Sequence, residues 1–359
     1  MIQKKTNNMA LRESNMELLR IVSMLFIVLE HILIMGTSFF EAPVGMQSQV
    51  ANFIIGFTYV GVNCFILISG WYGVEFSWKK LLNLYFICAF YELIGFMVHC
   101  IFGTGGFDRT QIANIIFPLS HSNIWFIRCY VVLLFITPLL KIGLCSLDKK
   151  QLLRVVLLLT IINVYFGWFW KGENYNSTGY TVSQMVYLYV IGWYLGCYFD
   201  LTVLRTKKIY LLASYFILAI AWGVCANSHW VIPHWNGWAY NNPGVLMASI
   251  CLFLFFSCIE LRSKTINWFA KGALSVLLVH MNRYIGEYIY DIVRSSVYCD
   301  VVIHSLILQV VVLMALALLI FLCLSAFDSF RRFLNNCIVS IYGMLGAQNN
   351  SSCHSSKAS

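Results

Sequence analysis

Long apolar runs separated by short polar connections make up most of the chain from residue 17 to residue 323. An α-helix rises about 1.5 Å per residue and a bilayer core is about 30 Å thick, so about 20 apolar residues span it. Ten runs approach this length, at residues 17–36, 52–72, 81–102, 124–141, 152–170, 183–199, 208–226, 244–261, 268–290 and 301–323. The pattern predicts an all-α, polytopic integral membrane protein with about ten transmembrane helices.

The composition places most of the chain in the membrane. Hydrophobic residues make up 60% of the 359 positions and charged residues 11%, against about 25% charged residues in soluble domains. We expect a multi-pass protein of the cell membrane (inner or plasma membrane), with an N-terminal segment (1–16), a transmembrane domain (17–325) and a C-terminal tail (326–359). The 13 cysteines are scattered singly, which favours buried free thiols over disulfides or a metal site.

Basic residues lie mainly in alternate connections. The set on one side is Lys4, Lys5, Arg12, Lys79, Lys80, Lys141, Lys149, Lys150, Arg154, Arg205, Lys207, Lys208, Arg262, Lys264, Lys271, Arg331 and Arg332. Positively charged connections stay on the cytoplasmic side, so both termini are predicted to be cytoplasmic. The net charge of +9 therefore reflects topology and does not indicate nucleic-acid binding.

The connections on the opposite side are rich in Trp, Tyr and Asn, most densely at residues 229–238. Aromatic side chains gather at membrane–water interfaces, which is one interpretation of this cluster. The other interpretation is a platform on which sugar rings stack. Gly192 and Gly196 have the spacing typical of close helix packing.

Arg20 and His31 are eleven residues apart in the first apolar run. Eleven residues make almost three helical turns, so the two side chains share a helix face about 16 Å apart along the axis. Ionisable groups inside a membrane are costly and indicate a functional site by default. A snorkelling arginine is the alternative for Arg20. Ser14 and Glu17 have the spacing of a capping box, and Glu30 points about 100° away from His31, toward another neighbour.

The predicted depths separate two groups of polar residues. A cationic group at the cytoplasmic side suits a phosphorylated cytosolic donor and consists of Arg20, Lys79 and Lys80. A second group extends from the middle of the membrane outward and consists of His31, His121, Arg128, His280 and Arg283. A histidine near the midplane suits proton transfer because its pKa lies near working pH.

In the fourth apolar run, helical spacing places His121, Trp125 and Arg128 on one face. Ser69 is a polar position in the second run, although Ser69 and Gly70 together are also read as a packing notch.

The ninth apolar run holds three ionisable residues at helical spacing, His280, Arg283 and Glu287. One continuous helix would align them as a polar stripe. An ion pair between Arg283 and Glu287 is the structural alternative to a functional role.

Four segments resemble signatures of the membrane-bound acyltransferase 3 family. Arg20-x10-His31 is similar to its first-span signature, and residues 64–72 resemble its Phe-Phe-x-x-Ser-Gly-Tyr/Phe segment. Residues 121–128, with Pro138, resemble its His-x-Trp-Phe segment and later proline. Residues 272–280 resemble its Gly-x-x-Ser-x-x-x-Tyr-Leu-x-His segment. The resemblance covers roughly residues 12–325.

The resemblance implies transfer of an acyl group, often acetyl, from a cytosolic donor onto hydroxyls of surface glycans, peptidoglycan or lipid-linked sugars. It implies that His31 is the catalytic histidine and Arg20 its partner. Lys79 and Lys80 stand where many members have two arginines, and Leu277 replaces a tyrosine of the last segment. We expect no appended soluble esterase-like domain, so that the chain either completes the transfer alone or uses a separate periplasmic or extracellular partner.

We therefore expect an O-acetyltransferase. Acetyl-CoA, the acyl donor, would bind through its phosphates to Arg20, Lys79 and Lys80, and we expect no metal. His31 would take the proton of the acceptor hydroxyl. The acceptor would be a saccharide or glycolipid held by Ser69, His121, Trp125, Arg128, His280 and Arg283. Membrane lipids are further partners, nucleic acid is not, and the oligomeric state stays open.

Two other functions fit part of the pattern. Buried His, Arg and Glu residues also suit a transporter or flippase for a lipid-linked saccharide or an anion, although no inverted repeat is visible. A glycan polymerase or ligase also combines many spans with outer arginines, but it would need larger outer loops than this sequence provides.

Overall fold

The computed structural model describes residues 13–41, 45–103, 109–121, 124–170, 176, 178–227 and 238–355. All regular structure in these ranges is helical, which confirms the expected all-α class. The elements are α1 (Ser14–Gly36), α2 (Met46–Thr58), α3 (Gly61–Tyr72), α4 (Trp78–Phe102), α5 (Arg109–Ile116), α6 (Pro118–His121), α7 (Trp125–Ser146), α8 (Lys149–Thr160), the π-helix η1 (Ile161–Phe169), α9 (Val182–Tyr198), α10 (Leu201–Thr206), α11 (Lys208–Asn227), α12 (Pro243–Ser257), α13 (Lys264–Ala270), α14 (Ala273–His280), α15 (Ile285–Val297) and α16 (Leu306–Ser355).

Seven stretches of the described chain are long and apolar enough to cross a membrane. They are α1, α2 with α3, α4, α7, α8 with η1, α11, and the part of α16 from Leu306 to Cys337. Helices α9 and α12 are apolar but have only 17 and 15 residues. The chain is therefore a multi-pass helical membrane protein. The predicted count of ten is not confirmed, and the cytoplasmic location of both termini stays a prediction.

The predicted ninth span does not form one helix. The chain instead forms α13, α14 and α15, with turns between them, and α14 ends at His280. In the second turn, Asn282 Oδ1 accepts a hydrogen bond from the backbone N–H of Tyr284 at 3.0 Å. Asparagine favours such turns because its side chain competes with the helical backbone hydrogen bonds. Arg283 and Glu287 therefore do not continue a polar stripe from His280. The second predicted span is likewise divided, between α2 and α3.

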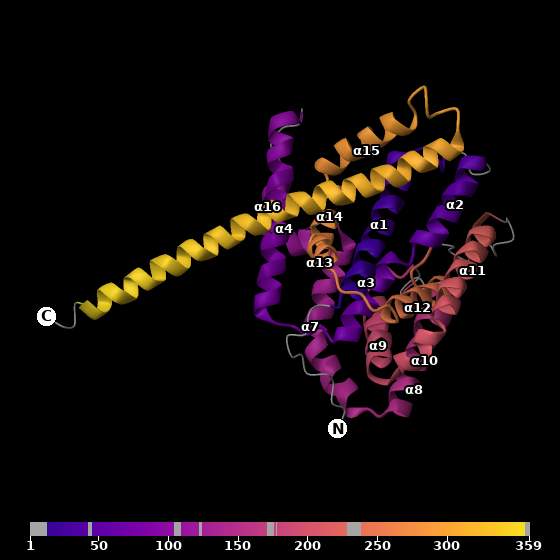
Figure 1. Ribbon diagram of the computed structural model, residues 1–359, viewed down its shortest axis with the longest axis horizontal. Coiled ribbons are helices and arrows are strands. Elements are labelled where there is room, and N and C mark those ends of the chain that lie inside the picture. The colour runs from indigo at the N-terminus through magenta and orange to yellow at the C-terminus, as the bar shows by residue number, and fades with distance from the viewer. Residues whose placement is uncertain are drawn as a thin grey trace.

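Helix α1 runs through the middle of the bundle (Figure 1) and packs against α2, α3 and α12 to α16. Beside it, α3 and α9 approach very closely. A Cβ on Gly70 would overlap the backbone carbonyl of Tyr189, and a Cβ on Gly192 would overlap that of Leu67. The predicted close packing at Gly192 is therefore confirmed. Side chains on α1 consequently face other helices on most sides.

Buried amide side chains fix the two loops that precede α9 and α12. Asn176 Nδ2 donates to Asn163 Oδ1 on η1 at 2.7 Å. Asn241 Nδ2 donates to the backbone carbonyls of both residues, and Gln184 Nε2 donates to the carbonyl of Tyr240 at 3.0 Å. Buried polar groups are stable when they are paired in this way. These bonds thus fix Asn176 and Asn241 against η1, and Tyr240 against α9.

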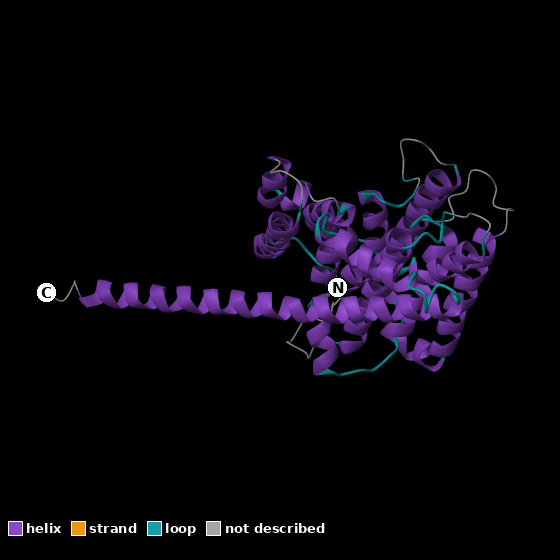
Figure 2. Cartoon of the chain, turned by 90° about the horizontal axis from the view of Figure 1, so that it is seen from above, coloured by secondary structure: helices purple, strands orange, loops and turns teal. Residues whose placement is uncertain are grey.

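The last helix, α16, crosses the bundle diagonally and then projects beyond it (Figures 1 and 2). Asp328 is fully buried at this crossing. It accepts hydrogen bonds from Tyr91 on α4 at 2.9 Å and from Ser275 on α14 at 2.5 Å. It also pairs with Arg331 at 2.7 Å and Arg332 at 3.0 Å. The packed body of the protein therefore continues past residue 325, and one carboxylate connects α4, α14 and α16.

We expect Asp328→Ala to lower stability by about 2 kcal/mol. Removing one partner of a buried ion pair costs about 3–5 kcal/mol, and partial exposure of the two guanidinium groups reduces this cost. Asp328→Asn should cost less because it keeps acceptors for Tyr91 and Ser275. Thermal unfolding in detergent measures the effect, with the exposed Asp300→Ala as the control. Equal stability of the Asp328→Ala and control variants would show that the network does not stabilise the fold.

Candidate functional site

The two histidines expected near the middle of the membrane are in contact. His31, on α1, and His280, the last residue of α14, approach to 2.9 Å between His31 Nδ1 and His280 Nε2. Their ring centroids are 5.2 Å apart. His280 is fully buried, whereas His31 is partly exposed. Only His31 is therefore placed to meet a ligand directly.

The second nitrogen of His280 determines the direction of this hydrogen bond. His280 Nδ1 lies 2.6 Å from the backbone carbonyl oxygen of Val276, which can only accept, so Nδ1 holds the proton. A neutral His280 then accepts at Nε2, and His31 donates from Nδ1. The assignment follows from the chemistry of the partners. It leaves His31 Nε2 without a proton, the state that a general base requires.

Both ends of the short helix α14 are held in place. Ser275, near its start, donates to the buried carboxylate of Asp328. At its end, the Tyr290 hydroxyl on α15 donates to the backbone carbonyl of His280 at 2.9 Å. Since α14 has only eight residues, these bonds fix the His280 ring relative to α1.

Arg20 lies on the same helix as His31 but in a separate environment. Its Nη1 pairs with Glu17 Oε1 at 2.8 Å, and its side chain is 24% exposed. Tyr72 and Tyr130 lie within electrostatic range of its charge. The predicted separation of Arg20 from His31 along α1 is about 16 Å. The two residues therefore lie at different places along α1 and have different partners.

The predicted capping box at the start of α1 is wrong. Glu13 is the N-cap, so Ser14 lies inside the first turn. The Ser14 hydroxyl accepts a hydrogen bond from the backbone N–H of Ser263 at 2.9 Å and donates to its carbonyl at 3.3 Å. Glu17 is therefore available to Arg20, which binds it one turn along the helix.

The structure does not bring Lys79 and Lys80 into contact with Arg20. Both lysines are exposed in the first turn of α4. Lys80 Nζ donates to the backbone carbonyl of Glu75 at 2.8 Å. The predicted cationic group is therefore not assembled by direct contacts within the described residues.

Trp125 and Ser69 find partners other than the two histidines. Trp125, the first residue of α7, packs on Tyr180 and Tyr240, with ring centroids 4.6 Å and 5.7 Å apart. Ser69 Oγ donates to the carbonyl of Phe65 in its own helix at 3.1 Å. Trp125 thus belongs to an aromatic group at the loops before α9 and α12.

The remaining predicted residues lie at the surface or outside the described side chains. Arg128 is exposed on α7, and Arg283 is exposed in the turn after His280. Among the ion pairs of the described residues, none joins Arg283 to Glu287, so that expected alternative is wrong. The side chain of His121 lies outside the described part of the chain.

Glu30 is a buried carboxylate for which the sequence suggested no role. It is 4% exposed and lies within electrostatic range of Tyr59, Tyr180 and Tyr240. The Tyr59 and Tyr180 hydroxyls are 2.9 Å apart, and Tyr59 stacks on Tyr240 at 4.5 Å. The prediction that Glu30 faces a neighbour other than that of His31 is confirmed. In the sequence, Glu30 stands out as a carboxylate in the middle of an apolar run.

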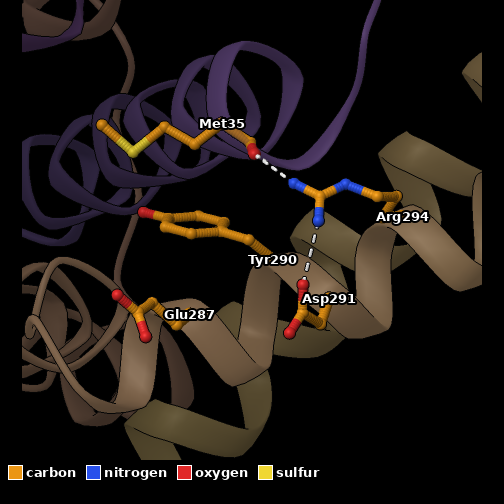
Figure 3. Close-up of a pocket in the computed structure, with 5 residues that line it drawn as sticks. All are labelled: Met35, Glu287, Tyr290, Asp291 and Arg294. Atoms are coloured by element: carbon orange, nitrogen blue, oxygen red, sulfur yellow. Dashed lines mark hydrogen bonds and ion pairs between the residues drawn. The ribbon is translucent and has the colours of Figure 1, made fainter.

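A surface pocket of about 380 Å³ lies at the end of α1, the helix that carries His31, and Figure 3 shows its lining residues. Its lining residues come from the end of α1 and from one face of α15: Met35, Glu287, Tyr290, Asp291 and Arg294. Sequence reasoning missed this pocket because it placed Glu287 and Tyr290 in a continuous membrane span that ended at residue 290, with Asp291 and Arg294 in the connection after it. The described residues contain no group of three His, Cys, Asp or Glu side chains that could hold a metal ion.

Comparison with known proteins identifies the family. Residues 13–343 match an acyltransferase domain, that of the acyltransferase 3 family. No curated protein and no solved structure matches the chain. The family match covers nearly the whole chain, including both histidines, and confirms the resemblance seen in the four sequence segments. The chain therefore belongs to the acyltransferase 3 family of membrane acyltransferases.

Proposed function

We propose that this acyltransferase moves acetyl from cytosolic acetyl-CoA onto a hydroxyl of a cell-surface or lipid-linked saccharide. The proposal rests on one observation above all, the hydrogen bond between His31 and His280. It supplies what acyl transfer to a hydroxyl needs, an imidazole nitrogen, Nε2 of His31, that holds no proton and can accept one. A histidine pair could also relay protons in a transporter, and the family match favours the acyltransferase.

The chemistry uses one proton and one acyl group. The acceptor hydroxyl gives its proton to His31 Nε2 while its oxygen attacks the thioester carbonyl of acetyl-CoA. The new C–O bond forms, the C–S bond breaks, and the CoA thiolate takes the proton from His31. While His31 is cationic, its Nδ1–H still donates to His280, so the charge is shared with a fixed neighbour. No residue changes its net protonation over the cycle.

Arg20 is the proposed contact for the negatively charged donor. Its guanidinium is partly exposed and can bind phosphate in a bidentate manner, which lysine cannot do. The separation of about 16 Å between Arg20 and His31 matches an extended donor with phosphates at one end and thioester at the other. With both termini in the cytoplasm, Arg20 faces the donor side and His31 lies toward the acceptor side. Lys79 and Lys80 add positive charge on the donor side.

His31→Ala should reduce transfer of label from radioactive acetyl-CoA to saccharide by about 10²–10⁴-fold, the usual contribution of a general base. The assay uses membrane vesicles from cells that express the protein, and protein amount is matched by immunoblot. His304→Ala, at an exposed turn, is the control and should keep wild-type activity. Wild-type transfer by a well-expressed His31→Ala protein would rule out the proposed catalytic role.

Arg20→Ala should raise the KM for acetyl-CoA and leave the KM for the acceptor unchanged. Glu17→Gln separates this role from a purely structural one, because it breaks the same ion pair but keeps the guanidinium. We expect Glu17→Gln to retain donor binding. If both variants lose stability equally and neither changes the KM for acetyl-CoA, then Arg20 only supports the fold.

A further inference from the structure

The pocket at the end of α1 is physically connected to the histidine pair. Met35 follows His31 by four residues, which is one helical turn and about 6 Å along α1. Tyr290, another lining residue, donates its hydroxyl hydrogen to the backbone carbonyl of His280. A molecule in this pocket would therefore lie within one turn of His31 and against a residue that holds His280.

The pocket is built from one face of α15. Glu287, Tyr290, Asp291 and Arg294 recur at intervals of three and four residues, so they project from the same side of that helix. Helix α15 lies across the end of α1 (Figure 1), and Val293 packs against Gly36. A polar helix face at this position is available to a ligand from the aqueous side.

One side chain holds the wall of the pocket in place. Arg294 pairs with Asp291 at 3.0 Å and also reaches the backbone carbonyl of Met35 at 3.5 Å (Figure 3). A cation at the C-terminus of α1 is favoured by the helix dipole. Asp291 and Arg294 are thus engaged with each other and with α1. Glu287 is exposed and forms no ion pair with the described residues, so its carboxylate is available to a ligand.

The charges of the lining residues select the chemistry of that ligand. Two carboxylates and one guanidinium leave one surplus negative charge, which disfavours phosphates and other anions. Carboxylate oxygens accept hydrogen bonds from hydroxyl groups, and Met35 and Tyr290 add a small apolar part to a mostly polar lining. Uncharged sugars present both hydroxyl donors and apolar C–H faces. The surplus charge thus disfavours the donor nucleotide, and the hydrogen-bond acceptors suit a neutral saccharide.

We propose that this pocket is the acceptor subsite and binds an uncharged sugar unit, with Glu287 accepting hydrogen bonds from its hydroxyls. The inference rests on the proposed function in one respect, namely that a second hydroxyl of the bound sugar is directed to His31. The proposed subsite is built from α1 and α15, whereas the acceptor residues expected from the sequence were Ser69, His121, Trp125, Arg128, His280 and Arg283.

The test measures protection of Glu287 from chemical modification, so it needs no turnover. Full-length protein in lipid nanodiscs is treated with a water-soluble carbodiimide and glycine ethyl ester, and labelled carboxylates are quantified by peptide mass spectrometry. The probes are the methyl glycosides of glucose, galactose and N-acetylglucosamine, with methyl glucuronide and acetyl-CoA as anionic controls. Asp300, exposed beyond the end of α15, is the reference carboxylate.

We expect at least one neutral glycoside to lower the labelling of Glu287 several-fold while labelling of Asp300 stays constant. Neither anionic control should protect Glu287. Met35→Trp, which fills the pocket at a half-exposed position, should abolish the protection. Absence of protection by every neutral glycoside, equal protection by the anions, or unchanged protection in Met35→Trp would each overturn the proposal. If the wild-type protein did not transfer acetyl groups, the proposed function would be contradicted. Protection of Glu287 by a neutral glycoside would still show that the pocket binds sugar.

Discussion

The hydrogen bond between His31 and His280 is the interaction on which the rest of the site depends. It joins two residues that are 249 positions apart, and it pairs the ring of the fully buried His280, where an unpaired polar nitrogen would be costly. The backbone carbonyl of Val276 fixes the proton on the far side of His280. A single carbonyl group therefore sets the protonation of two side chains and leaves one free nitrogen on His31.

The surrounding fold keeps this arrangement in place by holding α14. That helix is short and lies between two turns, so its own hydrogen bonds give it little independent stability. Asp328 binds its first half through Ser275, and Tyr290 binds its last carbonyl. Asp328 is itself compensated by two arginines on α16. Helix α16 thus supports the position of His280, because its residue Asp328 holds α14.

The sequence predicted the parts of this structure that depend on local pattern. The all-helical fold, the polar positions Arg20 and His31, and the Gly192 contact all follow from hydrophobicity and helical spacing. The breaks after Thr58 and His280 did not. Apolar residues continue around Thr58, and the polar residues after His280 fit a stripe on one continuous helix as well as they fit a turn. The partner of His31 could not be assigned from spacing, since no local rule relates residues so far apart. The pocket on α15 was missed for the same reason, because it exists only once α15 turns across α1.

The account makes one central claim that can be measured directly, the protonation pattern of the two histidines. Nitrogen-15 NMR of histidine-labelled protein in lipid, with signals assigned through His31→Ala and His280→Ala variants, reports which ring nitrogen holds the proton. We predict that both neutral histidines are protonated at Nδ1, with His31 Nε2 and His280 Nε2 unprotonated. A proton on Nε2 of neutral His31 would contradict the account, because that nitrogen could not then accept the proton of the acceptor hydroxyl.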